Sequence, residues 1–337
     1  MASLRKKQIF NNYETAFIIF SIIIVLFSSC SKEFEVKRQD NAIKIASFSK
    51  YSCQNPVFSP DGQYLVYTRF LRGYNIGPSE LVKIKIDGSA EKIIVSASDA
   101  DNVNVPQGSW VKNKICFSSD RGGGADEIWI VKDDGSDLEQ ISFHEEKDGI
   151  YYIEPVFNPK NTDLIAFEYV KGENDANAIH RIALLNVNTG SIKLLTDTTY
   201  DDRLPGWSHD GKKILFQRNE YGQDEGWKIY VADIDTEKSN PLSNIHSISY
   251  GNSDDTDCSW SFDDKYILSS SNHGGLEEPN IFLFSVDKSR VPVRATFSSS
   301  NEDGAAAQSP NGEKIAFESH YGEEEDYPLS IWIIEHR

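Results

Sequence analysis

The stretch FSPDGQYLVY, residues 58–67, decides the fold of this chain because its pattern returns in five later copies. In each copy a bulky residue closes a short apolar run, a polar turn follows, and a second apolar run begins. The copies lie about fifty residues apart, and self-similarity at that period predicts a propeller or a solenoid. The residues that open the six units are Phe58, Trp110, Phe157, Trp207, Trp260 and, more weakly, Gln308.

Each unit reads as four short strands joined by turns. The first turn ends in Asp-Gly or Asn-Gly at residues 61–62, 210–211 and 311–312, and these pairs favour the positive φ angles of tight hairpins. The third strand is rich in β-branched and aromatic residues, as in Ile128-Trp129-Ile130-Val131. Four short strands per repeat predict the blades of an all-β propeller.

The sixth unit reaches the end of the sequence after three strands. A strand-like run at residues 42–48, before the first unit, belongs to no other blade. An open ring would expose two sheet edges with unpaired backbone groups, and closure removes them. We therefore predict six four-stranded blades, closed by residues 42–48 as the outer strand of the last blade.

Three motifs resemble the WD40-like repeats of TolB-type six-bladed propellers: Ser59-Pro60-Asp61-Gly62, the segment 118–123, and Glu127-Ile128-Trp129. The resemblance covers about residues 42–337 and implies a shared fold. Unit two lacks the Pro-Asp-Gly turn, unit three has a longer one at residues 159–163, and unit six has no aromatic anchor. TolB also carries an α/β domain before its propeller, for which we expect no room here, so the contacts of TolB with its partners are not carried over.

The first thirty residues predict an address in the cell envelope. Three basic residues at positions 5–7 precede an apolar run at 16–27, which is too short for a bilayer span of about twenty residues but suits a secretory signal. The run ends in LFSSC, residues 26–30, which resembles a bacterial lipobox. We expect a signal peptide at 1–29, a lipidated Cys30 with a flexible tether at 30–41, and the propeller at 42–337. The alternative is an ordinary signal peptide or a short uncleaved anchor.

This address predicts an outer-membrane lipoprotein that faces the periplasm or is exposed at the surface. The net charge of −18 disfavours nucleic acid and anionic lipid headgroups as partners. Three further cysteines, Cys53, Cys116 and Cys258, lie far apart in the predicted blades, and we expect no disulfide among them.

Acidic residues recur where the chain enters each first strand and between the second and third strands. In a propeller these loops share one face around the channel, where converging carboxylates focus a negative potential. We expect this face to bind an envelope protein or a basic peptide segment, with a divalent cation at the channel mouth as a further candidate. A merely solvated acidic surface is the alternative. The candidate binding residues are Asp101, Arg121, Glu154, Asp202, Asp255, Asp257 and Asp303.

Catalytic motifs are mostly lacking. No nucleophile elbow of the form Gly-x-Ser-x-Gly occurs, as a hydrolase partnered with a propeller would need. The alternative function is a metal-dependent carbohydrate-active enzyme, similar in outline to propeller polysaccharide lyases, with histidines that we expect on the channel face as ligands: His246, His273 and His320. None of these histidines has a partner at metal-binding spacing. We therefore favour a non-catalytic platform that needs no cofactor.

Overall fold

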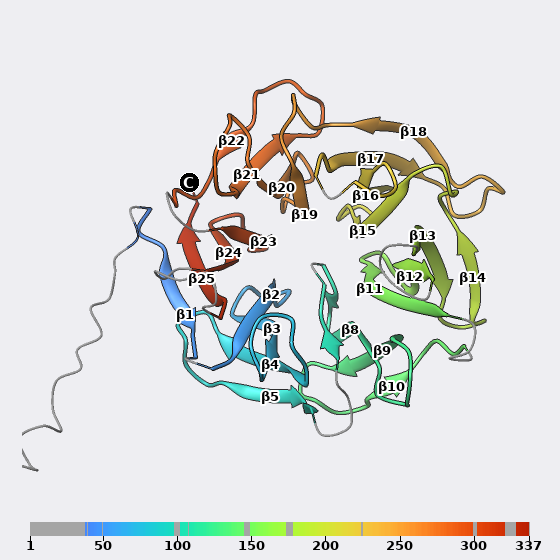
Figure 1. The fold of residues 1–337 in the computed structure, drawn as a ribbon. Helices are drawn as coiled ribbons and strands as arrows, with labels where there is room; N and C mark the ends of the chain where they lie inside the picture. Colours follow the sequence, from blue (N-terminus) through green and yellow to red (C-terminus); the bar gives the residue numbers. More distant parts are fainter. Residues whose placement is uncertain are drawn as a thin grey trace, which may run out of the picture. The chain divides into compact units, whose positions relative to one another are not determined.

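Six antiparallel sheets surround a common centre in a computed structural model of the chain (Figure 1). The structure describes residues 38–336 except 39, 49, 98–101, 107, 145–148, 173–177, 224, 299–301 and 321–327. Arg38–Arg337 forms one compact unit. Within the described residues there is no helix that is long and apolar enough to cross a membrane.

The first three blades follow one another along the chain. Blade 1 consists of β2 (Ser52–Phe58), β3 (Tyr64–Phe70), β4 (Ser79–Lys85) and β5 (Lys92–Val95). Blade 2 has its inner strand broken in two and consists of β6 (Val103–Asn104), β7 (Trp110–Val111), β8 (Lys114–Ser119), β9 (Glu127–Lys132) and β10 (Glu139–Gln140). Blade 3 consists of β11 (Ile150–Asn158), β12 (Asn161–Lys171), β13 (Ile179–Asn186) and β14 (Ser191–Leu194).

The other three blades complete the ring. Blade 4 consists of β15 (Asp201–Trp207), β16 (Lys213–Asn219), β17 (Lys228–Ile234) and β18 (Leu242–Ser247). Blade 5 consists of β19 (Asp255–Trp260), β20 (Tyr266–Ser271), β21 (Asn280–Ser285) and β22 (Val293–Arg294). Blade 6 consists of β23 (Asp303–Gln308), β24 (Lys314–Ser319), β25 (Ser330–Glu335) and β1 (Ile43–Ala46).

The predicted closure of the ring is confirmed, because β1 pairs antiparallel with β25. A buried arginine reinforces it from the segment before β1. The guanidinium of Arg38 donates to both carboxylate oxygens of Asp303 on β23, at 2.8 and 2.6 Å, and to Asp40 at 3.1 and 2.8 Å. The Asp40 carboxylate in turn accepts the backbone N–H of Phe297, between blades 5 and 6. Closure thus combines a sheet ladder with an ion-pair network.

The recurring Ser-x-Asp-Gly turn owes its sequence to local hydrogen bonds. In blade 1 the Ser59 hydroxyl donates to Asp61 at 2.6 Å and accepts the backbone N–H of Tyr64 at 2.9 Å. Gly62 donates its N–H to the Ser59 carbonyl and has φ of 70°, which favours glycine. The serines that begin the turns in blades 4, 5 and 6 accept the equivalent N–H at the start of the second strand: Ser208, Ser261 and Ser309.

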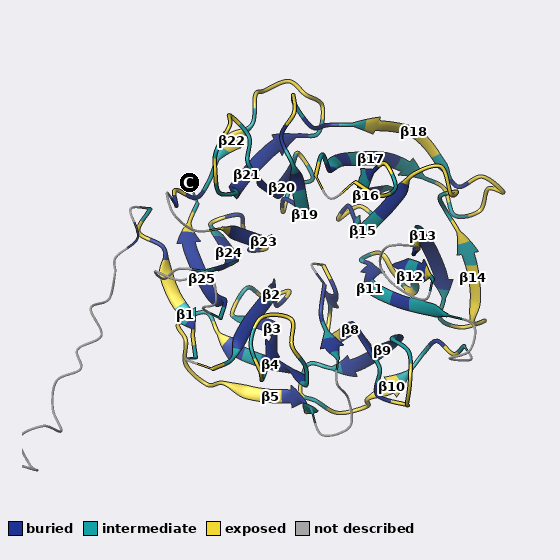
Figure 2. Ribbon diagram, in the orientation of Figure 1, coloured by how far each residue is buried: buried dark blue, intermediate teal, exposed yellow. Residues whose placement is uncertain are grey.

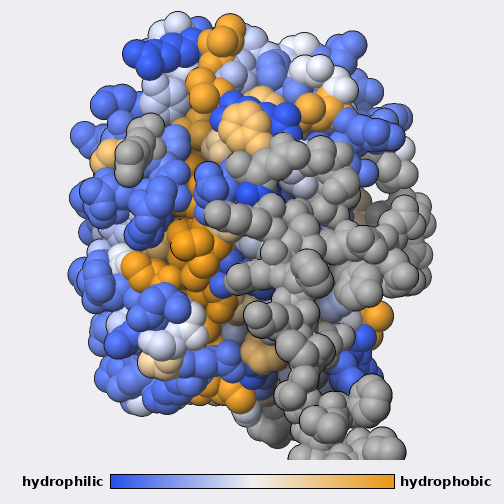
Figure 3. Space-filling model, turned by 90° about the vertical axis from the view of Figure 1, so that its left-hand side faces the viewer, coloured by the Kyte–Doolittle hydropathy of each residue, from blue (hydrophilic) through white to orange (hydrophobic). Residues whose placement is uncertain are grey.

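The hydrophobic core lies between neighbouring blades. One cluster joins Val66 and Leu81 of blade 1 to Trp110 and Phe117 of blade 2, and the other clusters bridge blades in the same way. Figure 2 shows buried residues on the inner and middle strands, whereas the outer strands β1, β14 and β18 carry exposed ones. On the flank seen in Figure 3, a narrow apolar band crosses a mostly hydrophilic surface. The prediction that the three propeller cysteines form no disulfide is confirmed, since all three are free and buried.

Candidate binding site

The inner strands carry a bulge at equivalent positions in five blades. The ladder between the first and second strand slips there, and one residue takes a positive φ of 42–55°. Such backbone is unfavourable for side chains other than Gly and Asn, and bulges of this kind re-aim side chains near functional sites. The five bulge residues are Asn55, Glu154, Leu204, Asp257 and Ala305.

Side chains of the second strand in the preceding blade hold these bulges. The backbone N–H of Asn55 donates to Glu318 at 2.7 Å, across the closure between blades 1 and 6. The Leu204 N–H donates to Glu168 at 3.1 Å, and the Asp257 N–H donates to Gln217 at 3.2 Å. Polar side chains of three second strands therefore support the bulges of the blades that follow them.

A cavity of about 860 Å³ lies where the bulges face the channel. Four carboxylates line it, together with amide side chains and with Arg72, Tyr74 and Asn75 of the β3–β4 loop. Its one other arginine, Arg203, is bound to Asp201 through two hydrogen bonds of 2.8 and 2.7 Å. The carboxylates come from blades 3, 5 and 6: Glu154, Glu168, Asp257 and Glu318.

Three of these carboxylates titrate abnormally. Burial, followed by the nearby charges of Glu168 and Asp257, raises the pKa of Glu154 to about 8. Burial and the charge of Asp257 raise the pKa of Glu318 to about 8. Burial and the charge of Glu302 raise the pKa of Asp257 to about 6. Like charges at a buried site disfavour one another's ionised form, and a cation bound among them would favour that form.

Three of the four carboxylates are not paired with any cation that the structure describes, although Arg72 and Arg203 line the same cavity. Among the described residues, the interactions of Glu154, Asp257 and Glu318 include no ion pair with Lys, Arg or His. Glu154 accepts a hydrogen bond of 2.8 Å from the Asn104 amide, and Glu318 accepts the backbone N–H of Asn55. The fourth carboxylate differs, because Glu168 lies 2.6 Å from Nδ1 of the buried His180. The cavity thus offers three carboxylates to a positively charged guest.

The structure separates the candidate residues into two groups. Glu154 and Asp257 line the cavity. Three others are buried and bound inside the blades: Asp202 to Arg218 at 2.6 and 2.9 Å, Asp303 to Arg38, and Asp255 to the Ser271 hydroxyl at 2.5 Å. We expected these residues in loops that lead into the first strands. That placement is wrong for all five, because the inner strands β11, β15, β19 and β23 already include them.

The remaining candidates lie elsewhere. Arg121 lies in the β8–β9 loop, is buried, donates to the Ser96 carbonyl at 2.8 Å and packs over Trp129. Asp101 and Cys30 lie outside the described residues, as do the signal peptide and most of the tether, of which only residues 38, 40 and 41 are described. Arg121 therefore lines a separate small pocket of blade 2 rather than the acidic cavity.

The three histidines of the alternative metal site lie on three different blades. His246 is on β18, the outer strand of blade 4, so its expected position near the channel face is wrong. The ring of His273 contacts those of Tyr250 and Phe282 in blade 5. The ring of His320 is tilted against that of Tyr74, with 5.3 Å between the ring centroids. In the part of the chain that the structure describes, no three His, Cys, Asp or Glu side chains are placed to hold a metal ion.

Sequence reasoning missed Glu318 and the amides around it. A signal exists, because an aromatic residue followed by a polar one recurs in the second strand of five repeats. In blades 1, 3, 4 and 6 the polar residue of each pair lies opposite the residue that directly precedes the bulge. In blade 2 it lies opposite Asn104 on the first inner strand segment. The five pairs are Tyr67-Thr68, Phe117-Ser118, Phe167-Glu168, Phe216-Gln217 and Phe317-Glu318.

Comparison with protein families identifies the repeat. A family model described as the TolB beta propeller domain matches residues 27–247, more than half of the chain. The chain belongs to this family. A search of curated proteins found no sequence that matches this chain. The resemblance inferred from the repeat motifs is therefore confirmed.

Solved structures share the fold at low sequence identity. A putative TolB from Agrobacterium tumefaciens is 15% identical, with a TM-score of 0.55, over 86% of this chain and 91% of that one. An oligogalacturonate lyase in complex with manganese is 9% identical, with a TM-score of 0.59, over 90% of this chain and 94% of that one. A puromycin hydrolase is 14% identical, with a TM-score of 0.59, over 87% of this chain but only 48% of its own length. This family of propellers therefore shares its fold with proteins of several activities.

Proposed function

We propose that the chain is a cell-envelope propeller that acts as a non-catalytic binding platform, and that its acidic cavity receives the cationic side chain of a basic peptide segment in a protein partner. The observation that carries this proposal is the group of three carboxylates, Glu154, Asp257 and Glu318, in one cavity without an ion-pair partner among the described residues. A Lys or Arg side chain would supply the missing charge and hydrogen-bond donors.

The rigid ring suits such a platform. Loops and bulges carry the binding groups, while the six packed blades fix their positions before a partner arrives. Membership of the TolB beta propeller domain family and the likeness to a putative TolB support an envelope setting. The LFSSC segment supports lipid anchoring through Cys30, and loss of fatty-acid label from a Cys30→Ser variant in cells would test it.

Binding of a fluorescent tetralysine peptide tests the cavity. The variant Glu154→Gln/Asp257→Asn/Glu318→Gln should bind it at least tenfold more weakly than the wild type. The matched control, Asp87→Asn/Asp134→Asn/Asp287→Asn, removes the same formal charge from exposed turns. An equal loss in both triple variants would mean that net charge alone attracts the peptide, and the proposal would fail.

The pH dependence of this binding supplies an independent test. Below pH 8 the cavity glutamates hold protons that a cationic guest must displace, because their pKa values are raised to about 8. Affinity should therefore rise between pH 6 and pH 8.5 in the wild type and stay nearly flat in the cavity triple variant. A wild-type affinity that is constant over this range contradicts a site made of these carboxylates.

A further inference from the structure

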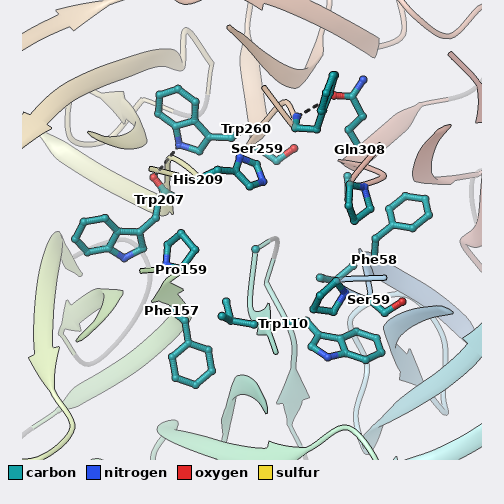
Figure 4. Close-up of a pocket in the computed structure, with 18 of the residues that line it drawn as sticks. Phe58, Ser59, Trp110, Phe157, Pro159, Trp207, His209, Ser259, Trp260 and Gln308 are labelled. Atoms are coloured by element: carbon teal, nitrogen blue, oxygen red, sulfur yellow. Dashed lines mark hydrogen bonds between the residues drawn. The ribbon is translucent and has the colours of Figure 1, made fainter. Parts of the chain in front are cut away.

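A second cavity lies at the other end of the channel. It has a volume of about 310 Å³ and is surrounded by the ends of inner strands and by the turns that follow them (Figure 4). Glu154 of the acidic cavity and Phe157 of this one are three residues apart on β11, about 10 Å along the strand. We refer to it as the apolar cup, walled by Phe58, Trp110, Phe157, Trp207 and Trp260.

The two cavities are separate sites. They share no lining residue, and a small space of about 20 Å³ lies between them, bordered by Glu154 and Asp257 of the acidic cavity and by Cys258 of the cup. Such a space holds about one water molecule and no more. A ligand of the cup therefore enters and leaves on the side of the hairpin turns, away from the acidic cavity.

The walls of the cup favour an apolar ligand. Each of the five aromatic residues is at most 7% exposed, because its ring is wedged between blades. No ring face is therefore open for stacking against a sugar or for holding a cation, both of which need one. What remains accessible is ring edges and the prolines of the turns, Pro60, Pro159 and Pro310.

Most polar side chains around the cup are already hydrogen-bonded within the protein. The exceptions are the exposed Lys112 and the buried Nε1 atoms of Trp110 and Trp207, which have no hydrogen-bond partner among the described residues. The Ser259 hydroxyl donates to the Ala306 carbonyl at 2.6 Å. The Gln308 amide donates to the Gly312 carbonyl at 3.2 Å and accepts the Phe262 N–H at 3.1 Å. The Ser59 hydroxyl is bound in its turn, and Nδ1 of His209 lies 2.8 Å from Asp264. Apart from these two indole N–H groups and Lys112, the lining offers little to replace the water that a strongly polar ligand would lose, so a largely apolar ligand is favoured.

We propose that the apolar cup binds a small uncharged aromatic molecule of one to three rings. The volume lies at the lower end of small-molecule sites, which hold about 300–1,000 Å³. A polypeptide fits less well, because its backbone N–H and C=O groups would enter a blind apolar space without partners. This site is independent of the acidic cavity and of the function proposed for it.

Titration with the uncharged dye N-phenyl-1-naphthylamine tests the proposal in the full-length protein. Its emission should rise to saturation with one site per chain, and energy transfer from the cup tryptophans should accompany it. The anionic dye 1-anilinonaphthalene-8-sulfonate should bind at least tenfold more weakly. The variant Glu154→Gln should bind the neutral dye like the wild type, which separates this test from that of the acidic cavity.

A matched pair of variants locates the dye. Gly108 lines the cup with φ of 76°, and a Cβ there would meet no atom within 4 Å. Gly108→Ala and Gly108→Leu carry the same backbone strain, but only leucine fills the cup. Dye affinity should fall at least tenfold in Gly108→Leu and by less than threefold in Gly108→Ala.

If Gly108→Leu does not fold, Phe262→Lys provides the second variant, because this side chain is 43% exposed at the cup and lysine brings a charge to it. The affinity should again fall at least tenfold. Absence of saturable binding in the wild type overturns the proposal, and so does binding that the folded cup variants leave unchanged.

Discussion

Replacing Glu154 by glutamine should stabilise the protein in a pH-dependent way. The pKa of this carboxyl is raised from 4.5 to about 8 in the folded chain, by burial and by the charges of Glu168 and Asp257. The folded state therefore keeps a proton that the unfolded chain releases as the pH rises above about 4.5. Stability from this group is fully present below pH 4.5 and is lost between pH 4.5 and pH 8. Glutamine cannot ionise, so the variant escapes this loss.

The magnitude follows from the shift. A pKa difference of this size corresponds at pH 8 to about 4 kcal/mol of unfolding free energy, if water did not reach the group. Glu154 lines a cavity that is open to solvent, so we expect a gain of about 1–3 kcal/mol at pH 8 and close to zero at pH 4.5. The hydrogen bond from the Asn104 amide survives, since the glutamine oxygen also accepts it.

Urea unfolding at pH 4.5 and at pH 8 measures the effect. Glu139→Gln, on the exposed outer strand β10, is the matched control and should change stability equally at both pH values. The reasoning is refuted if Glu154→Gln follows the wild-type pH profile, or if it destabilises the protein at pH 8. Either result would mean that the carboxylate is well solvated and that the cavity is not a site of unfavourable negative charge.

Two further substitutions test the construction of the ring. Arg38→Ala should lower the unfolding free energy by about 3–5 kcal/mol in urea, because it leaves the buried Asp303 without its ion-pair partner, whereas Arg72→Ala at an exposed site should have almost no effect. Gly312→Ala should lower the unfolding free energy by about 1–3 kcal/mol, and with it the melting temperature. The added Cβ would overlap the ring of Phe262, and residue 312 has a φ of 76° that disfavours alanine. Combining this substitution with Phe262→Ala should recover part of that loss, and a purely additive double variant would contradict the steric explanation.

The architecture could be predicted because its determinants are local. The Ser-x-Asp-Gly turn of blade 1 closes through hydrogen bonds within five residues, from Ser59 to Tyr64. Closure of the ring could also be predicted, because the strand-like run before the first unit and the open edge of the sixth can pair their backbone groups with each other. The ion pair between Arg38 and Asp303 could not be predicted, because the two residues are 265 positions apart and no local pattern links them.

The acidic cavity was predicted only in part, because a carboxylate's direction depends on the bulge. Side chains alternate between the two faces of a strand, so a shift of one residue moves a side chain from the channel to the blade interior. Counting acidic residues near the start of each inner strand does not reveal this shift. Asp257 at a bulge lines the cavity, while Asp255 on the same strand is fully buried.

Repeat position separates the two groups of carboxylates more sharply than charge does. Asp202, Asp255 and Asp303 each lie two residues before the bulge of their blade, where blades 1 and 3 carry the buried Cys53 and Tyr152. That position faces the packed interior in every one of these blades, so its carboxylates need an internal partner. The bulge position itself faces the channel. It is acidic in two blades, as Glu154 and Asp257, whereas the other three blades have Asn55, Leu204 and Ala305 there. Each bulge lies three residues before the residue that opens its repeat, as Glu154 does before Phe157. Comparing that position across the repeats would therefore have selected the two cavity residues from the sequence and assigned the other three to the blades.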